Sequence, residues 1–253
     1  MQPLTHGRYT ARLATTPADL AAALALRQLR FRTGRGLPQP ASDADAFDDA
    51  CTHVLVSNTK GDLVCCFRVL RFASGADIAR SYAAQFYNLS PLQTIARPVM
   101  ELGRFCLHPD HSDPDILRLA WAALTRLVDQ GAVTMLFGCS SFDGADPVRH
   151  RAALGWLARN HLGPTHLRPA HLRPTVLAPD PVNLTARDAP ISPPALPPLL
   201  RSYLAMGGWV SDCAVIDHDL NTLHVFTALD IAAIPPARAR ALRALAALAH
   251  TSS

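Results

Sequence analysis

Residues 99–110 constrain the fold more than any other stretch of the chain. Their apolar positions predict a short strand that ends at Pro109. Two charged residues, Glu101 and Arg104, lie inside this strand. Charged side chains are rarely buried unless they are paired or take part in chemistry. The stretch therefore predicts either a structural ion pair or a carboxylate and a guanidinium that act on a ligand.

The composition is that of a cytoplasmic globular protein. Of the 253 residues 49% are hydrophobic and 17% charged, which predicts a packed core. The longest apolar run, residues 20–26, is too short to cross a bilayer, and the N-terminus lacks the apolar core of a signal peptide. No two of the six cysteines have a zinc-ligand spacing, so we expect reduced thiols and no metal. A net charge of +4 favours acidic partners or an anionic membrane, and no basic run with interleaved aromatics indicates nucleic acid.

Strand and helix patterns predict a mixed α/β sheet. The first strand is expected at residues 8–13, and Thr16 followed by Pro17 predicts the start of a helix over 17–31. A hairpin is expected over 53–70. The remaining predictions are helices at 79–86, 114–129, 147–160, 197–206 and 236–250, and strands at 134–142 and 223–229.

Proline content suggests how one domain is organised. We expect a core over residues 1–160, a proline-rich connector packed on it over 161–198, and C-terminal helices and a strand over 199–253 that complete the same domain. His161, His166 and His171 recur every five residues within the connector. Proline at the same spacing keeps the chain extended and separates the imidazoles, which favours a connector over a metal site.

Several motifs resemble one family. The sequence ELGRFCLHPD at residues 101–110 resembles the central strand of the ornithine N-acyltransferases and, more distantly, that of the acyl-homoserine lactone synthases. Both belong to the GCN5-related N-acyltransferase (GNAT) superfamily. Further matches lie at residues 82–89, 137–147, 196–207 and 217–222, so the resemblance extends over most of the chain. It implies a GNAT-like, mostly antiparallel sheet with splayed central strands, flanked by helices, with a Pro-rich wrap and C-terminal helices.

The resemblance also implies a reaction. A 3-hydroxyacyl group would pass from acyl carrier protein to the α-amine of L-ornithine and give lyso-ornithine lipid, with Glu101 as general base. No cofactor is expected, since phosphopantetheine arrives on the carrier protein. The alternatives are an N-acyltransferase for another amino acid, an acyl-homoserine lactone synthase, and a non-catalytic module that binds acyl carriers or lipids.

Five residues are candidates for substrate binding. Arg27 and Phe31 match an Arg-x-x-x-Phe motif of the family. Asp48 lies in a Phe-Asp motif and is the candidate for holding the ornithine side-chain ammonium, although a turn aspartate is an equal alternative. Arg68 and Arg104 are candidates for a carboxylate or phosphate. For Arg68 the alternative is a strand arginine at the solvent edge.

The donor site is predicted from the two central strands. By resemblance, the residues that contact the acyl donor are Phe105, Cys106, Leu107, Cys139, Ser141, Phe142 and Gly144. Residues 110–115 precede a helix where relatives that use acetyl-CoA bind pyrophosphate, yet here they contain no glycine and three aspartates. This segment would repel a pyrophosphate, which favours acyl carrier protein over coenzyme A.

The last predicted helix has two different sides. Leu242, Leu245, Leu248 and Ala249 share one side, and Arg240, Arg243 and His250 share the other. This pattern favours a helix docked on its own domain. A basic amphipathic helix can also bind an anionic membrane. Since an N-acylated product partitions into bilayers, peripheral contact with the inner face of the cytoplasmic membrane is a further expectation.

Overall fold

A computed structural model describes residues 1–37, 42–172, 181–186, 190 and 193–248. The chain divides into two compact units. Unit 1 comprises Met1–Arg71, Leu102–Val133 and Pro235–Ser253, and unit 2 comprises Phe72–Glu101 and Thr134–Ile234. The strand β6 (Val99–Leu107) passes from unit 2 into unit 1 immediately after Glu101. The expectation of one continuous domain stays a prediction.

Unit 1 is built on a sheet with the strand order β1-β2-β3-β4-β6. Consecutive pairs from β1 to β4 are antiparallel. The predicted strand at residues 8–13 is confirmed as β2, and a further strand, β1, precedes it across a turn at Gly7, whose φ of +56° is readily adopted by glycine. The predicted hairpin over 53–70 is confirmed and extends at both ends. The bounds are β1 Leu4–His6, β2 Tyr9–Leu13, β3 Thr52–Asn58 and β4 Leu63–Phe72.

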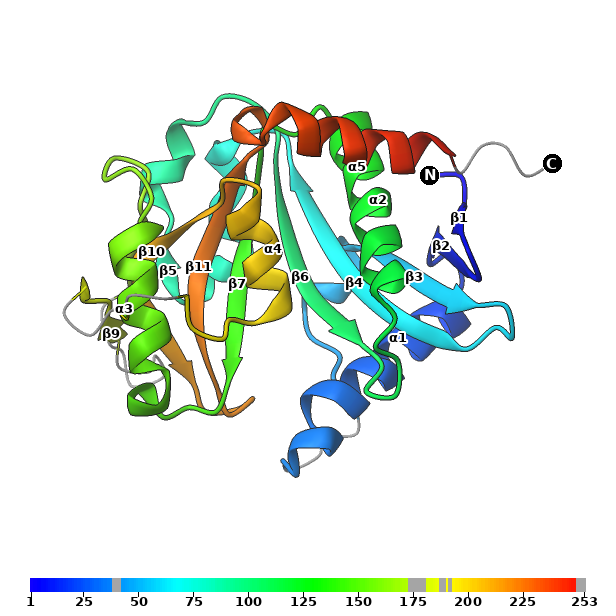
Figure 1. Ribbon diagram of the computed structural model, residues 1–253, viewed down its shortest axis with the longest axis horizontal. Coiled ribbons are helices and arrows are strands. Elements are labelled where there is room, and N and C mark those ends of the chain that lie inside the picture. Colours follow the sequence, from blue (N-terminus) through cyan, green and yellow to red (C-terminus); the bar gives the residue numbers. More distant parts are fainter. Residues whose placement is uncertain (38–41, 173–180, 187–189, 191–192, 249–253) are drawn as a thin grey trace. The chain divides into compact units, whose positions relative to one another are not determined.

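Three helices complete unit 1. The first, α1 (Pro17–Phe31), begins with a capping box in which Thr16 and Asp19 each accept the other's backbone N–H. The second, α2 (Pro114–Gln130), begins at the N-cap Asp113 and lies against β1, β2 and β3 (Figure 1). The third, α5 (Pro236–Leu248), lies against α2. All three helices were predicted from their caps and periodicity.

Unit 2 contains a second set of strands in the order β6-β7-β11-β10-β9. Among these described strands only β6 and β7 are parallel, and their register has three pairs, from Val99 opposite Met135 to Glu101 opposite Phe137. The other neighbours are antiparallel, which confirms the prediction of a mixed, mostly antiparallel sheet. The bounds are β7 Met135–Asp143, β9 Pro181–Asn183, β10 Trp209–Asp217 and β11 Thr222–Asp230.

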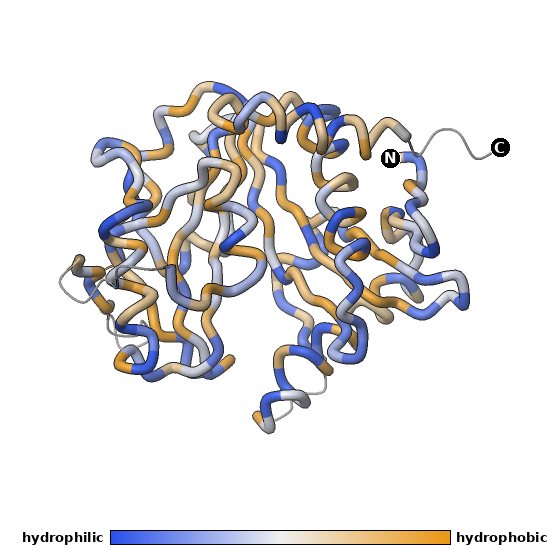
Figure 2. Tube along the Cα trace, in the orientation of Figure 1, coloured by the Kyte–Doolittle hydropathy of each residue, from blue (hydrophilic) through white to orange (hydrophobic). Residues whose placement is uncertain are grey.

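Helices α3 (Arg151–Asn160) and α4 (Pro198–Ala205) cover one face of these strands. Apolar residues of both helices form a core with Phe142, Leu223 and Val225. The predicted helix over 147–160 begins with a 3-10 turn, η6 (Pro147–His150), before α3. Figure 2 shows that the strands of both units are rich in hydrophobic residues, as buried sheets require.

The predicted helix over 79–86 was wrong. The segment instead forms two 3-10 turns, η3 (Gly75–Arg80) and η4 (Ala83–Gln85), and the short strand β5 (Tyr87–Asn88), which pairs with β8 (Ala170–His171). The backbone N–H groups of Tyr82 and Ala83 bond to the Glu101 side chain rather than to a preceding helical carbonyl. A contact from a distant strand therefore overrides the local helical pattern.

The remaining short helices are 3-10 turns: η1 Thr33–Arg35, η2 Asp48–Ala50, η5 Ser90–Thr94 and η8 Ile231–Ala233. Across the described parts of the chain, no helix is both long enough and apolar enough to cross a bilayer.

Candidate active site

Glu101 lies on β6 and is held by two backbone groups of unit 2. Its side chain is buried, and the residue is 5% exposed. The atom Oε2 accepts the N–H of Tyr82 at 2.8 Å, and Oε1 accepts the N–H of Ala83 at 2.7 Å. Bonds of this kind to a carboxylate are stronger than those between neutral groups. The orientation of the carboxylate is therefore fixed before any ligand binds.

The charge of Glu101 also affects Tyr203 on α4. Burial raises the pKa of Tyr203, and the nearby Glu101 carboxylate raises it further. Tyr203 thus keeps its phenolic hydrogen at physiological pH. A buried carboxylate with backbone donors can serve a structural or a chemical role, so the catalytic role of Glu101 stays a prediction.

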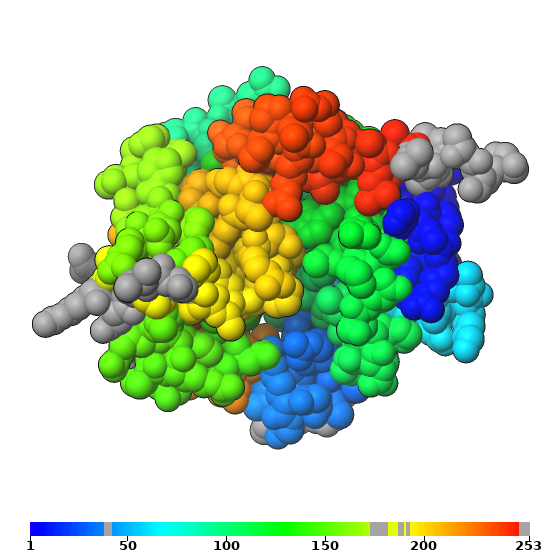
Figure 3. Space-filling model, in the orientation of Figure 1, coloured from blue at the N-terminus to red at the C-terminus, as the bar shows by residue number. Residues whose placement is uncertain are grey.

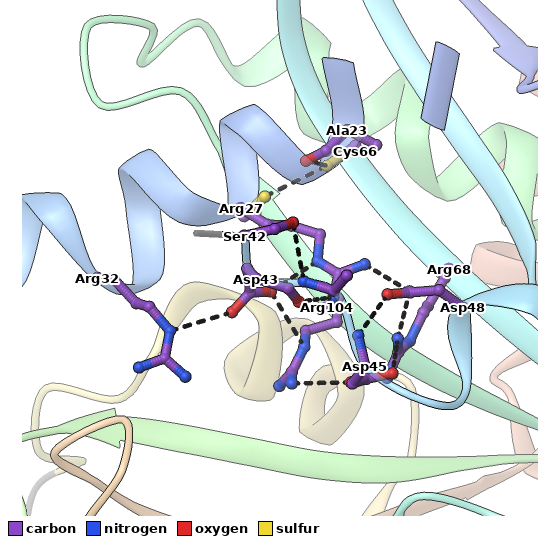
Figure 4. Close-up of polar contacts among 12 residues, drawn as sticks. Ala23, Arg27, Arg32, Ser42, Asp43, Asp45, Asp48, Cys66, Arg68 and Arg104 are labelled. Carbon is purple, nitrogen blue, oxygen red and sulfur yellow. Dashed lines mark hydrogen bonds and ion pairs between the residues drawn. The ribbon is translucent and has the colours of Figure 1, made fainter. Parts of the chain in front are cut away.

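A second group of charged residues lies in unit 1, and we call it the Arg–Asp cluster (Figure 4). It consists of Arg27, Arg32, Asp43, Asp45, Asp48, Arg68 and Arg104. Arg27 comes from α1 and is 1% exposed. Its Nε donates to Asp43 Oδ2 at 2.8 Å, and its Nη1 donates to Asp48 Oδ1 at 2.6 Å. One buried guanidinium therefore ties the helix to two points of the loop that follows it.

Strands β4 and β6 supply the other side of the cluster. Arg68, on β4, donates from Nη1 and Nη2 to the two oxygens of Asp45 at 2.6 and 2.8 Å, and it also contacts Asp48. Arg104, on β6, donates from Nη2 to Asp45 Oδ2 at 2.9 Å. This fork geometry is typical of strong arginine–carboxylate pairs. Arg68 is buried, so the alternative of a strand arginine at the solvent edge was wrong.

The cluster keeps Asp45 and Asp48 ionised. Burial alone would raise the pKa of Asp48, but hydrogen bonds from Arg27 and from the backbone of Asp45 outweigh it and hold the pKa at about 2. The pKa of Asp45 is also lowered, because its bonds to Arg68 outweigh the effect of burial. Four guanidinium groups and three carboxylates leave the seven described side chains with one positive charge in excess.

The structure brings together four predicted site residues, namely Arg27, Asp48, Arg68 and Arg104. Phe31 is not in the cluster: its ring lies 5.9 Å from the guanidinium carbon of Arg35. Sequence reasoning missed Asp43 and Asp45. Charge balance was the available signal, because three arginines expected near one aspartate need further carboxylates if they are buried.

Asp48 was predicted to bind the ornithine side-chain ammonium, but other groups of the protein already donate hydrogen bonds to its carboxylate. Its Oδ1 already accepts from Arg27 and Arg68, and its Oδ2 accepts the backbone N–H of Asp45 at 2.9 Å. Asp45 is the more accessible acid, with a side chain 22% exposed. The role of Asp48 stays a prediction.

Three predicted donor-binding residues lie on the unit 1 part of β6. Phe105 stacks on Phe67 with 5.4 Å between ring centroids. The Cys106 and Cys66 sulfurs are 3.4 Å apart and buried, and Leu107 is half-buried. Just before them, Arg104 has a φ of +51°, a left-handed conformation that is costly for a residue with a side chain. Such local strain is common near functional sites.

The other predicted donor-binding residues lie on and after β7 in unit 2. Cys139 is half-buried and Ser141 is exposed, and both point to the same face of the strand because side chains alternate. Phe142 points to the opposite face and packs in the core with α3 and α4. Gly144 follows the strand with a φ of +98°. Their contact with a donor stays a prediction.

The N-terminus of α2 is occupied by the protein's own acids. Asp113 accepts the backbone N–H of Asp115 at 3.0 Å as N-cap. It also accepts hydrogen bonds from Tyr9 and Arg8, each at 3.0 Å. The backbone donor that would face a pyrophosphate is therefore already used by a carboxylate.

Metal ligands do not converge in the described residues: no group of three or more His, Cys, Asp or Glu side chains is arranged to hold an ion. In the histidine repeat, the His161 ring packs on Trp156, and burial lowers the pKa of His161.

Comparisons with known proteins agree with the motifs. Residues 26–122 match the acetyltransferase (GNAT) domain family. An L-ornithine N(alpha)-acyltransferase of Rhodobacter capsulatus is 34% identical over 89% of this chain and 91% of its own, and one of Brucella abortus is 29% identical over 89% and 85%. A solved N-acyl amino acid synthase from uncultured soil microbes aligns over 100% of both chains with a TM-score of 0.46 and 13% identity. The protein is an N-acyltransferase of the GNAT superfamily, and the chain belongs to the L-ornithine N(alpha)-acyltransferase family.

Proposed function

We propose that the protein transfers a 3-hydroxyacyl group from acyl carrier protein to the α-amine of L-ornithine and so forms lyso-ornithine lipid. The observation that carries the proposal is the match, over nearly the whole chain, to relatives named L-ornithine N(alpha)-acyltransferase. The described residues allow each part of the reaction to be argued separately.

The chemical step is direct attack of the amine on the thioester. The nitrogen forms a bond to the carbonyl carbon, the carbon–sulfur bond breaks, and the thiolate leaves with a proton. The attacking amine must lose a proton, and we assign its removal to Glu101, directly or through a water molecule. The two backbone donors support this role because they fix the orientation of the carboxylate.

The acceptor amino acid is assigned to the Arg–Asp cluster. Its excess of one positive charge favours a carboxylate, which would compete with Asp45 for the planar guanidinium groups of Arg104 and Arg68. Among the acids, Asp45 has the more exposed side chain, and an ornithine side-chain ammonium would compete there with the hydrogen bonds from Arg68 and Arg104.

The donor is assigned to acyl carrier protein. The Asp113 carboxylate already caps α2, so a pyrophosphate would meet negative charge where GNAT enzymes that use coenzyme A present free N–H groups. Phosphopantetheine on a carrier protein needs no such cradle. We place its arm along the face of β7 that carries Cys139 and Ser141.

Contact with an anionic membrane is a further part of the proposal. Each buried CH₂ of an acyl chain contributes ~0.8 kcal/mol to membrane partitioning, so a long-chain product leaves water strongly. Helix α5 lies on the surface beside α2 (Figure 3). It carries the exposed residues Arg238 and Arg240. These positive charges would attract the protein to an anionic membrane, into which the product partitions.

One experiment tests the whole proposal. Lipids of a bacterial host that lacks ornithine lipids are extracted with and without this chain and compared by mass spectrometry. We expect a new N-(3-hydroxyacyl)ornithine only when the chain is present. Another N-acyl amino acid would correct the acceptor, an acyl-homoserine lactone would move the protein to that class, and no new product would contradict the enzymatic proposal.

A further inference from the structure

His224 and Tyr87 form a buried pair in unit 2, 2% and 1% exposed. The Tyr87 hydroxyl donates to the backbone oxygen of His224 at 2.9 Å and lies 3.1 Å from His224 Nδ1. Because the phenolic hydrogen is used on the carbonyl, Nδ1 must carry the imidazole hydrogen, and Nε2 keeps a lone pair. Burial lowers the pKa of His224 to about 3, so the ring is neutral at physiological pH.

The Nε2 atom of this ring is buried and has no hydrogen-bond partner among the described residues. The same holds for Thr222 Oγ1, two positions earlier on β11. Residues two apart on a strand point to the same face. An unsatisfied buried polar atom costs about 1–3 kcal/mol, and most native structures avoid it. Two of them on one face of one strand suggest that a ligand supplies the missing bonds.

This face is the one that carries the predicted donor residues of β7. In the antiparallel register Ser141 lies opposite His224, and Cys139 lies opposite Phe226. Ser141 is exposed, and the half-buried ring of Phe86 contacts the imidazole edge-on at 4.8 Å between centroids. Phe86 and Ser141 therefore both border His224 and reach the surface.

Glu101 and His224 are attached to the same short segment. The segment starts with Tyr82 and Ala83, which donate to Glu101, and it ends with Phe86 and Tyr87, which contact His224. Only the 3-10 turn η4 separates the two ends. One short segment thus contacts both the imidazole and the carboxylate that we assign to the amine proton, and carbon 3 of an acyl chain is only two bonds from the thioester carbonyl carbon.

We propose that His224 Nε2 accepts a hydrogen bond from the 3-hydroxyl group of the acyl donor and thereby selects 3-hydroxyacyl over unsubstituted chains. The inference rests on the proposed function, since it concerns the donor of that reaction. A hydroxyl is both donor and acceptor. It can donate to Nε2, and it offers the kind of acceptor that the Thr222 hydroxyl on the same face of β11 lacks. His224 is then a specificity residue for the donor.

The test compares two donors that differ only in this hydroxyl. The purified enzyme is assayed with ornithine and with acyl carrier protein loaded with a 3-hydroxyacyl or an unsubstituted acyl chain of equal length. We expect kcat/KM to be about tenfold or more higher for the hydroxylated donor, as one hydrogen bond of ~1.4 kcal/mol provides. A structural defect would lower both values together, so the ratio is the informative measurement.

Two variants form a matched pair. His224→Asn keeps a polar atom near the Nδ1 position and removes the one at Nε2, so the ratio should fall to near one. His224→Gln places a polar atom near Nε2 and should keep part of the preference. A ratio unchanged in a folded His224→Asn enzyme, or a wild-type ratio near one, would overturn the assignment.

A second measurement needs no variant. Inhibition constants of the wild-type enzyme for N-(3-hydroxyacyl)ornithine and for N-acylornithine should differ in the same direction, and equal constants would count against the assignment. Acylation of ornithine from both donors at equal rates would remove the role of His224 and leave the proposed function intact. No acylation from either donor would overturn both.

Discussion

The backbone N–H of Ala83 donates to Oε1 of Glu101 at 2.7 Å, across 18 positions of sequence. Tyr82 binds the second carboxylate oxygen in the same way. These bonds give Glu101 a structural task in addition to the chemical one that we assign to it. A substitution at this position changes both, so activity and stability must be measured together.

Glu101→Gln keeps one acceptor oxygen and places an NH₂ group against one of the two backbone donors. We expect turnover to fall ~10²–10⁴-fold if Glu101 is the base. The unpaired donor should also lower the free energy of unfolding by about 1–3 kcal/mol. Single-turnover rates and urea unfolding measure the two effects. A folded variant with near-normal turnover would remove Glu101 from the role of base.

Tyr82→Pro is the matched control. Tyr82 has a φ of −60° and Ser81 has extended angles, both compatible with proline at position 82. The variant removes one N–H donor to Glu101 and leaves the carboxylate in place. We expect a stability loss similar to that of Glu101→Gln with a much smaller loss of turnover. Equal turnover losses in the two variants would indicate that Glu101 acts only by holding the segment.

In the Arg–Asp cluster, the stability that is lost when a carboxylate is replaced should be larger the more deeply that carboxylate is buried. Arg27 and Asp43 are both almost fully buried, so Asp43→Asn removes one of the two ionised partners of a buried guanidinium, the other being Asp48. Removing one member of a buried ion pair typically costs ~3–5 kcal/mol. The more exposed Asp45→Asn should cost clearly less. Urea unfolding of both variants tests the order, and equal losses would contradict it.

The pKa of Asp48 predicts sensitivity to acid. Its folded-state pKa of about 2 lies below the ~3.9 of an unfolded aspartate. A depressed carboxyl pKa gives stability that is present above the unfolded pKa and is lost as the pH falls through the folded pKa. Wild-type stability should therefore fall between pH 4 and pH 2, and a folded Asp48→Asn variant should show a shallower fall. Parallel curves from urea unfolding at each pH would contradict the assignment to Asp48.

Local signals predicted the elements that local physics determines. The Thr16 cap and Pro17 gave the start of α1, and the Asp113 cap gave the start of α2. Strand β10 was missed because a bulge between Val210 and Ala214 shifts its register and interrupts the alternation of side chains. The segment over 79–86 was assigned to the wrong structure because Glu101, far along the chain, takes two of its donors.

The site was predictable only in part for the same reason. The resemblance indicated Arg27, Asp48, Arg68 and Arg104, which the fold brings together. Asp43 and Asp45 pair with arginines 11 to 61 positions away, and no spacing rule in the sequence predicts such pairs. Likewise, the sequence does not indicate a role for His224. Its Nε2 becomes a candidate only because the structure shows no hydrogen-bond partner for it among the described residues.

The capped N-terminus of α2 predicts donor choice. With matched chains, kcat/KM should be higher for acyl carrier protein than for free acyl-CoA, because Asp113 fills the position where pyrophosphate would bind. Asp113→Asn keeps a capping oxygen and removes the charge, so it should bring the kcat/KM for acyl-CoA closer to that for acyl carrier protein. Equal or better use of acyl-CoA by the wild-type enzyme would contradict the assignment of the donor.

One side of helix α5 already packs on α2, which limits the surface that the helix can offer to a membrane. Ala246 is buried, Arg126 of α2 donates to its backbone oxygen, and Arg243 Nη2 pairs with Asp129 Oδ1 at 2.9 Å. The sequence expectation that the helix docks on its own domain is therefore confirmed. Figure 2 shows hydrophilic and hydrophobic residues alternating along α5, and Arg238 and Arg240 remain exposed.

These two arginines predict salt-dependent, peripheral binding to anionic vesicles. Attraction between surface charges acts within about 8 Å at physiological ionic strength, so co-sedimentation should weaken as salt is added. Arg238→Glu and Arg240→Glu should weaken it further without lowering Tm.

Arg243→Glu is a poorer probe, because it places a carboxylate beside Asp129 and disturbs docking as well. Lys60→Glu, in the exposed turn between β3 and β4, is the matched control because it makes the same change in net charge elsewhere. If the wild-type protein does not co-sediment with anionic vesicles even at low salt, the helix serves docking alone and the product must reach the bilayer by another carrier.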